Sequence, residues 1–348
     1  MTRVLLEMEK LKNPNSGLGQ CCLHLGKQFQ ELAYESMALD FYVPGSSQEI
    51  FGNRFNYVKQ NPLHKFFPLR SNNYDVWHCL HQGSQYFPSD KRTKVLLTVH
   101  DLNFLEKYSG PKRKLKLRQL QSKVNRASAI TVVSRYTESV LREHVNVATM
   151  PVHVIYNGIT LIKADATPTI DLSEYGEYFF SIGIVSPKKN FHVLLPLLSH
   201  FKNMHLVIAG PADSDYAQHL RDDAKRLNVY DRFHLLGSVS QSDKYRLHAG
   251  CKAFVFPSLT EGFGMPVVEA MSLGKPVFLS NLSSLPEIGG TEAFYFKSFD
   301  AESMIETIEP GMKEYESDPD KEARLIKWTE RYSWRNAALA YLNLYKSL

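Results

Sequence analysis

The chain has 348 residues, which at ~150 residues per domain predicts two domains with two sizeable cores. Hydrophobic residues make up 43% and charged residues 22%, which excludes a collagen-like, low-complexity or disordered chain. The net charge of only +5 argues against a surface that is basic throughout, as in a nucleic-acid coat protein.

Short runs rich in β-branched and aromatic residues alternate with longer helical patterns along the whole chain. Such alternation predicts βαβ units with buried parallel strands, and therefore an α/β fold. The strands expected in the first half are residues 3–8, 76–80, 94–99, 129–133 and 152–156. Those expected in the second half are residues 178–182, 205–209, 232–236, 253–257, 276–280 and 293–296. Each half can form its own open, doubly wound, Rossmann-like sheet.

A domain boundary is predicted after Asn157-Gly158, a strong turn dipeptide. Short polar residues and prolines replace the periodic apolar ones in the stretch that follows. We therefore expect an N-terminal domain over residues 1–160 and a C-terminal domain over 170–327. Residues 328–348, which include Trp334, end in a helical pattern. We expect them to form a C-terminal helical segment separate from the two domains.

Targeting signals and cysteine motifs are not evident in the sequence. The amino terminus has too few apolar residues for a secretory signal, and no apolar run approaches the ~18 residues that span a bilayer. The four cysteines exclude a disulfide scaffold and lack the spacing of a zinc site or redox pair. We expect a soluble or peripheral protein in the cytoplasm, a reducing compartment.

Basic residues cluster in residues 107–126, which hold eight lysines and arginines and no acid. A helix is expected to begin near Ser109, with an apolar stripe at helical spacing on one side. The basic side is either a solvated face or a contact with an anionic membrane surface or a lipid-diphosphate acceptor. Nucleic acid is disfavoured because the segment lacks interleaved aromatic residues. The candidate contact residues are Lys112, Arg113, Lys114 and Lys116.

The most informative loop follows the strand expected at residues 253–257. It contains Glu261-Gly262-Phe263-Gly264, and a helix is expected to begin near Pro266. Ligands of open α/β sheets bind at the carboxyl ends of strands, and glycines and helix amides favour anions there. Glu261 and Glu269 suit the hydroxyl groups of a polyhydroxylated ligand. Taken alone, the pair is equally typical of a capped surface helix with two solvated acids.

Residues 261–269 resemble the Glu-(seven residues)-Glu motif of the retaining nucleotide-sugar glycosyltransferases of the GT-B fold, the group 1 glycosyltransferases. Residues 183–190 are similar to the family's strand-end loop, whose lysine binds the donor diphosphate. Further similar segments follow in the family's order, and the resemblance covers nearly the whole chain. They are residues 17–19, 98–102, 133–134 and 154–158. One departure is Ile184, where many relatives carry Arg or Thr, so Lys188 would have to supply that phosphate contact.

The resemblance implies two doubly wound domains facing each other across a cleft, with the tail helix crossing back to the N-terminal domain. The C-terminal domain would hold the donor, with Glu269 on the ribose and Lys189 on the diphosphate. Glu261 would bind the sugar hydroxyls, and His100 would contact the transferred sugar from the N-terminal domain. The implied catalytic residues are Glu261, His100 and Lys189. The implied donor-binding residues are Gly17, Gly19, Gly183, Lys188, Lys189, Gly262, Phe263, Gly264, Met265 and Glu269.

The resemblance also implies the chemistry. A hexosyl unit would pass from a GDP- or UDP-sugar to a glycan or lipid-linked acceptor in polysaccharide or lipopolysaccharide synthesis, with retained configuration. The mannosyltransferase-like branch favours GDP-mannose as the donor. No metal and no cofactor beyond the nucleotide-sugar co-substrate is expected. The acidic pair Asp213 and Asp215 is better explained by helix capping than by a metal site.

Three other functions are weighed against this one. A nucleotide-sugar epimerase or hydrolase of the same fold remains an alternative, as does a non-catalytic protein that binds anionic lipid. A dehydrogenase would need a complete glycine fingerprint, but Cys22 replaces its third glycine after Gly17 and Gly19. We expect those two glycines to lie in a flexible loop directed at the diphosphate, with an ordinary helix start as the alternative.

Overall fold

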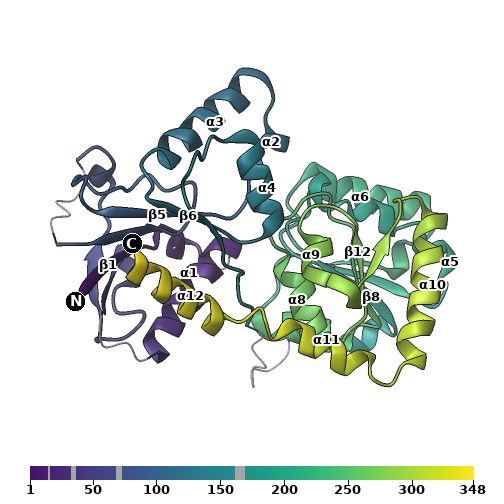
Figure 1. Ribbon diagram of the computed structural model, residues 1–348. Coiled ribbons are helices and arrows are strands. Elements are labelled where there is room, and N and C mark those ends of the chain that lie inside the picture. The colour runs from purple at the N-terminus through teal and green to yellow at the C-terminus, as the bar shows by residue number, and fades with distance from the viewer. Residues whose placement is uncertain (15, 33–36, 68–72, 161–168) are drawn as a thin grey trace. The chain divides into compact units, whose positions relative to one another are not determined.

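The computed structural model describes the whole chain except residue 15 and residues 33–36, 68–72 and 161–168. The chain divides into two units by its internal contacts. The N-terminal unit comprises Met1–Gly158 and Tyr332–Leu348, and the C-terminal unit comprises Ile159–Arg331. Each unit is a parallel β-sheet flanked by helices (Figure 1).

Within the described residues, the N-terminal unit has a seven-stranded sheet in the order β3-β2-β1-β4-β5-β6-β7, with all neighbours parallel. Strand order reverses between β1 and β4, so their carboxyl ends border a topological switch point, where α/β proteins place ligands. The strands are β1 (Thr2–Glu7), β2 (Met37–Val43), β3 (Asn56–Lys59), β4 (Val76–Cys79), β5 (Lys94–Val99), β6 (Ala129–Val132) and β7 (Val152–Val154).

Two of these strands, β2 and β3, are not among those expected from the sequence. The apolar pattern of β2 is broken at its centre by Asp40, a residue that strands usually lack. In the fold Asp40 is buried, and it accepts hydrogen bonds from Arg3 at 2.9 Å, Tyr74 at 2.9 Å and Asn56 at 3.1 Å. Partners from distant segments therefore compensate a buried carboxylate that local sequence leaves unexplained.

Helices flank this sheet, and the last of them returns from the far end of the chain. The helices are α1 (Gly17–Glu31), α2 (Phe104–Lys107), α3 (Gly110–Val124), α4 (Arg135–His144) and α12 (Trp334–Ser347), with 3-10 turns η1 (Glu9–Lys12), η2 (Gly45–Ser47) and η3 (Pro62–Lys65). Figure 1 shows α12 beside α1 on the N-terminal unit. The phenol of Tyr345 in α12 lies 2.6 Å from Nδ1 of His78, and Nε2 of His78 lies 2.7 Å from the Thr98 hydroxyl.

The entry to α12 is packed so closely that only glycine fits beside it. A Cβ atom on Gly158 would lie 2.1 Å from the backbone nitrogen of Trp334. The Trp334 ring stacks on His24 of α1 with 5.9 Å between the ring centres. The turn glycine expected at the domain boundary is therefore also the contact point of the returning helix.

The C-terminal unit contains, within the described residues, a six-stranded parallel sheet in the order β10-β9-β8-β11-β12-β13. Each strand expected in this half is present. The order reverses between β8 and β11, which marks the switch point of this sheet. The strands are β8 (Tyr178–Ile182), β9 (His205–Ala209), β10 (Phe233–Leu235), β11 (Ala253–Phe256), β12 (Val277–Ser280) and β13 (Phe294–Phe296).

Helices flank this second sheet. The helices are α5 (Leu197–His200), α6 (Asp215–Arg226), α7 (Gln241–Gly250), α8 (Met265–Ser272), α9 (Leu285–Gly289), α10 (Ala301–Ser317) and α11 (Lys321–Thr329). Of these, α5, α6 and α10 bury a core with the sheet that includes Phe179, Phe191 and Phe278. The 3-10 turns are η4 (Leu172–Tyr175), η5 (Pro187–Lys189), η6 (Phe191–Leu194), η7 (Tyr230–Arg232) and η8 (Gly290–Glu292). No helix among the described residues of the chain is long and apolar enough to cross a membrane.

Candidate functional site

Lys189 and Glu261 form an ion pair at the switch point of the C-terminal sheet. Lys189 ends η5, in the loop after β8, and Glu261 lies in the loop after β11. The Lys189 Nζ lies 2.5 Å from the Glu261 Oε1, and the Ser258 hydroxyl donates to the same oxygen at 2.6 Å. The side chains of Lys189 and Glu261 are 14% and 13% exposed, so a ligand can reach both.

A glycine makes this pairing possible. Gly183 directly follows β8 with a φ of 151°, and a Cβ atom there would lie 2.7 Å from Cε of Lys189. The lysine side chain therefore passes over Gly183 toward the second loop. The two loops are also joined through their backbones, because the Leu259 amide donates to the Lys188 carbonyl at 2.9 Å. The lysine and the carboxylate are thus held in place before any ligand arrives.

Two serines from the loop after β12 fix the Glu261-Gly262-Phe263-Gly264 loop. The Glu261 amide donates to the Ser283 hydroxyl at 3.0 Å, and the Ser284 hydroxyl donates to the Phe263 carbonyl at 2.8 Å. Gly264 then takes a φ of 107°, a conformation that favours glycine, at the N-cap of α8. As expected, Pro266 lies in the first turn of this helix. The sequence patterns did not identify Ser283 and Ser284 as part of the site, because both are distant in sequence from Glu261.

The charge of Glu261 depends on two opposing effects. Burial raises the pKa of its carboxyl group, but the charges of Lys189 and Lys188 and two hydrogen bonds lower the pKa further than burial raises it. The net pKa is below the ordinary value, so Glu261 is ionised at neutral pH. The Lys189 ammonium also stands 4.7 Å from the centre of the Phe256 ring. The site therefore presents one fixed cation and one fixed carboxylate side by side.

Glu269 projects from α8 and pairs with two residues of α7. Its Oε1 lies 2.6 Å from the Lys244 Nζ, and its Oε2 lies 3.5 Å from Nε2 of His248. Burial raises the pKa of Glu269, but His248 and Lys244 together bring it below the ordinary value. Burial lowers the pKa of His248, so this imidazole is neutral. Lys244 and His248 are four residues apart on one helix face, a spacing that could have identified them.

The remaining residues of the C-terminal unit that are expected to contact the donor lie in the same loops or at the start of α8. Gly262 and Phe263 precede Gly264, and the Phe263 side chain is buried, so a ligand would meet the backbone of this loop. Met265 is the first residue of α8. Ile184, at the position where the family often has a polar residue, is 66% exposed. Lys188 and Lys189 are therefore the basic residues of this loop.

His100 is held in the N-terminal unit at the end of β5. Its Nε2 lies 2.8 Å from the carbonyl oxygen of Leu80, which can only accept, so this nitrogen carries a proton and donates it. Its backbone amide donates to the Gln82 Oε1 at 3.1 Å. Burial lowers the pKa of His100, and the ring is neutral with Nδ1 as its acceptor nitrogen.

Comparison with known proteins places these features in a family. The profile described as "Glycosyl transferases group 1" matches residues 168–331, and that described as "Glycosyltransferase Family 4" matches residues 17–162. The chain belongs to the group 1 glycosyltransferases. The family expected from the Glu-(seven residues)-Glu motif is thereby confirmed.

Two relatives of this glycosyltransferase are mannosyltransferases. The O-antigen chain mannosyltransferase RfbU of Salmonella typhimurium is 28% identical over 241 residues, which cover 69% of this chain and 66% of that protein. The O-antigen chain mannosyltransferase B of Escherichia coli is 23% identical over an alignment of 384 positions that covers 99% of this chain and 100% of that protein.

A solved structure similar to this glycosyltransferase is that of Anabaena HepE in complex with UDP-glucose. It has a TM-score of 0.75 and 17% identity, and the match covers all of both chains. At this identity the likeness establishes the fold alone. The expected GT-B class, with two doubly wound Rossmann-like domains, is confirmed.

The glycine pair of this glycosyltransferase departs from expectation. Gly17 and Gly19 lie in the first turn of α1 and not in a flexible loop, so that prediction was wrong. Ser16 caps the helix and accepts a hydrogen bond from the Gly19 amide at 3.1 Å. A Cβ atom on Gly19 would lie 2.0 Å from the Asn13 carbonyl oxygen, so close backbone packing explains this glycine.

The acidic pair near residue 213 serves a helix end. Ser214 is the N-cap of α6, accepting from the Ala217 amide at 3.2 Å, and Asp215 is in the first helical turn. Capping is therefore performed by the serine between the two aspartates. Neither aspartate belongs to a cluster of possible metal ligands in the part of the chain that the structure describes.

The basic segment runs from the last residue of α2, through all of α3, to Arg126, with Pro111 in the first turn of α3. Its members have different environments. Lys123 donates to the Gln82 carbonyl at 2.7 Å and Arg126 to the Pro88 carbonyl at 2.9 Å, so both stabilise the fold. Lys112 and Lys114 are exposed, and Arg113 and Lys116 are partly exposed. The candidate contact surface is thus the N-terminal half of α3.

Proposed function

We propose that this glycosyltransferase moves a hexosyl unit from a nucleotide sugar to a glycan or lipid-linked acceptor, with retention of configuration. The observation that carries the proposal is the Lys189–Glu261 pair at the C-terminal switch point, with Glu269 buried on the adjoining helix. Our first choice of donor is GDP-mannose, supported by the two mannosyltransferase relatives. Their names also support a role in O-antigen or similar polysaccharide synthesis.

The donor would occupy the C-terminal unit. Lys189, with Lys188 and loop amides, would bind the diphosphate and stabilise the charge that develops on it as the sugar leaves. Glu261 would accept hydrogen bonds from the sugar hydroxyls, since its ionised carboxylate lies beside the lysine. Glu269 would accept hydrogen bonds from the ribose, with Lys244 and His248 holding its carboxylate in position.

Retention is explained by displacement on the front face of the sugar. The bond between the anomeric carbon and the diphosphate oxygen breaks, and a bond to the acceptor oxygen forms on the same face. The acceptor proton passes to the departing diphosphate oxygen. This scheme requires no protein nucleophile, no metal and no cofactor. His100, neutral and with Nδ1 able to accept, would contact the transferred sugar.

A thermal-shift panel of GDP, UDP, dTDP and ADP tests the donor assignment. A nucleotide at 100-fold its dissociation constant adds ~2.7 kcal/mol to the free energy of unfolding, so the cognate nucleotide should raise the unfolding temperature most. We expect GDP to do so. A larger shift with UDP would replace the mannose assignment while leaving the transferase assignment standing.

Release of nucleotide from the sugar donor tests the reaction itself. We expect release that requires a glycan or lipid-linked acceptor. Equal release without any acceptor would instead indicate a hydrolase, and interconversion of the bound sugar would indicate an epimerase. Nucleotide binding without any turnover, together with vesicle binding, would favour the non-catalytic lipid-binding alternative.

The exposed half of α3 supports a peripheral contact with an anionic membrane or with the lipid diphosphate of an acceptor. Four basic residues gather there, and Leu115 among them is 53% exposed. An apolar side chain surrounded by lysines suits the boundary between lipid head groups and acyl chains. The proposal therefore includes an acceptor that is carried by a membrane.

A further inference from the structure

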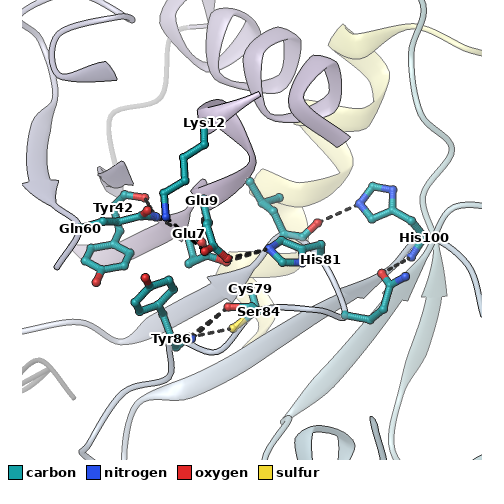
Figure 2. A network of polar contacts seen from close by, with 12 residues as sticks. Glu7, Glu9, Lys12, Tyr42, Gln60, Cys79, His81, Ser84, Tyr86 and His100 are labelled. Carbon is teal, nitrogen blue, oxygen red and sulfur yellow. Dashed lines mark hydrogen bonds and ion pairs between the residues drawn. The ribbon is translucent and has the colours of Figure 1, made fainter. Parts of the chain in front are cut away.

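Three polar side chains meet at the switch point of the N-terminal sheet (Figure 2). Glu7 is the last residue of β1, His81 follows the neighbouring strand β4 by two residues, and Glu9 is the first residue of η1. Each offers one possible metal-ligand atom, and the three atoms lie within 4.8 Å of one another. Neither the sequence motifs nor the proposed transfer reaction uses this cluster.

Glu7 and His81 are buried, and one polar atom of each is not satisfied by the protein. Nε2 of His81 lies 3.6 Å from Oε2 of Glu7 and 3.8 Å from Oε2 of Glu9. Glu7 and His81 are 0% and 1% exposed. Neither Oε2 of Glu7 nor Nε2 of His81 has a hydrogen-bond partner among the residues that the structure describes. Buried polar atoms are rarely left in this state, because lost hydration is then uncompensated.

The other carboxylate oxygens are already engaged. Oε1 of Glu7 accepts from the Glu9 amide at 2.7 Å and from the Gln60 amide group at 3.4 Å. Oε1 of Glu9 lies 3.4 Å from the Lys12 Nζ. The protein thus fixes one oxygen of each glutamate and leaves the other facing the imidazole (Figure 2).

The geometry of the cluster fits a missing cation. Oε2 of Glu7 and Oε2 of Glu9 both face Nε2 of His81. A cation at the centre would compensate both carboxylates and occupy the imidazole lone pair.

We propose that Glu7, Glu9 and His81 bind a divalent transition-metal ion, with Zn²⁺ as the best fit. Ligand atoms separated by 3.6 Å and 3.8 Å surround a point roughly 2.1–2.4 Å from each, close to the usual Zn–N and Zn–O bond lengths. One nitrogen and two oxygen ligands suit zinc, and a fourth position stays open for a water molecule. The ion would join η1 to the loop after β4.

The test is zinc binding by the full-length protein after metal removal. Competition with a chromophoric zinc chelator should reveal one tight site per chain, and Co²⁺ in its place should give the visible absorption bands of a four-coordinate site. Glu7→Gln and His81→Gln should each weaken zinc binding by more than the ~10–100-fold that loss of an outer-shell partner costs. Glu9→Gln, at the more accessible ligand, gives a third variant that is the least disruptive to the core.

Two control variants should bind zinc like the wild type. Cys79→Ser removes the thiol that lies in the same region, where it donates to the Tyr86 carbonyl (Figure 2). Asp213→Asn removes an acid from the pair at α6. Circular dichroism of each variant verifies folding, and Glu9→Gln decides the matter if a core variant fails to fold.

Two results would overturn the proposal. One is a wild-type protein that binds zinc no better than the folded Glu7→Gln or Glu9→Gln variant, which would leave a proton shared between Glu7 and His81. The other is loss of zinc in Cys79→Ser alone, which would assign the ion to a thiol. Both are independent of the donor site, because nucleotide binding reports on residues of the C-terminal unit.

Discussion

At the scale of single residues, the two glutamates of the motif have different surroundings despite equal charge. Glu261 shares one oxygen between Lys189 and Ser258 and stays partly exposed. Glu269 is buried more deeply on a helix and is held by Lys244. Because their environments differ, the two glutamates can have different roles. Substituting each glutamate separately can distinguish these roles.

Glu261→Ala is expected to abolish transfer while the dissociation constant of the free nucleotide stays within a few-fold of wild type. The reason is that its proposed contacts are with the sugar and not with the nucleotide. Calorimetric titration with GDP and a turnover assay measure the two quantities. Glu302→Gln, an exposed acid in the first turn of α10, is the matched control. Loss of nucleotide binding together with turnover would contradict this placement.

Glu269→Ala is expected to weaken binding of the nucleotide itself, by ~1–3 kcal/mol, because a charged hydrogen-bond acceptor is lost. The same calorimetric titration measures the change. Lys244→Met should weaken nucleotide binding less than Glu269→Ala does, since it removes a residue that positions the carboxylate and not the carboxylate. An unchanged nucleotide dissociation constant in Glu269→Ala would exclude the ribose assignment.

At the scale of secondary-structure elements, α12 and α3 show how helices acquire roles that their own sequences only partly indicate. The helical pattern of the tail was evident, but its partners on β4, β5 and α1 come from the other end of the chain. The apolar stripe of α3 was equally evident, yet only the fold separates Lys123, which donates to the Gln82 carbonyl, from the exposed cations of the helix.

The docking of α12 predicts a pH dependence of stability. Burial, with a smaller contribution from His100, lowers the pKa of His78 to about 3 from its ordinary value of 6.5. Below pH 6.5 the unfolded chain binds a proton at His78 that the folded protein excludes. The free energy of unfolding should therefore decrease as the pH is lowered from 6.5 toward 3. This one histidine contributes at most ~1.4 kcal/mol per pH unit.

Urea denaturation at pH 7.5 and pH 5.5 measures this effect. The loss of stability between the two should be about 1.4 kcal/mol smaller in His78→Gln than in wild type, because glutamine does not titrate. His153→Gln, at an exposed position on β7, serves as the control. An equal loss in wild type and His78→Gln would show that another group governs the transition.

Charge reversal on α3 tests its contact with membranes. Replacing Lys112, Arg113, Lys114 and Lys116 together by Glu should release the protein from anionic vesicles and reduce turnover with a membrane-borne acceptor. Nucleotide binding by the C-terminal unit should be unchanged. Since such attraction is screened within ~8–10 Å at 0.1–0.15 M salt, wild-type vesicle binding should also fall as salt is raised.

Vesicle sedimentation at two salt concentrations decides between the alternatives for α3. A matched control replaces Lys123, whose ammonium is engaged by the Gln82 carbonyl, with Gln and should leave vesicle binding unchanged. Equal and salt-insensitive partitioning of wild type and the fourfold variant would show that the basic side of α3 is merely solvated.

At the scale of the whole molecule, each sheet carries a charged cluster at its own topological switch point. The C-terminal sheet has a lysine beside its carboxylate, whereas the N-terminal sheet has two carboxylates beside an imidazole. The first suits a phosphate-bearing ligand and the second suits a cation. The two proposals therefore predict opposite responses to metal ions.

Transfer is expected to continue in EDTA and to gain nothing from Mg²⁺ or Mn²⁺. Lysines, loop amides and the start of α8 would neutralise the diphosphate in place of a divalent ion. Turnover after EDTA treatment, with and without each metal, measures this. Loss of turnover that Mg²⁺ or Mn²⁺ restores would contradict the donor scheme, whereas loss restored only by Zn²⁺ would point to Glu7, Glu9 and His81.

The sequence by itself determined the fold class, eleven of the thirteen strands in the described residues, and the family. These follow from local signals: apolar runs of strand length, turn dipeptides, and a motif whose two glutamates are only eight residues apart. Such signals depend on neighbours along the chain. The fold class, these strands and the family could therefore be predicted without knowledge of the three-dimensional structure.

Only the tertiary structure decided which side chains meet. The partners of Glu261 include Lys189, 72 residues away, and Ser283, 22 residues away. The ligands Glu7 and His81 come together because β1 and β4 are neighbours in the sheet, although 74 positions separate these residues in the sequence. Strand β2 was missed for the same reason, since the partners of Asp40 are remote. Long-range strand pairing and burial determine these contacts and the charge states of the side chains that make them. The local sequence pattern contains no information about either.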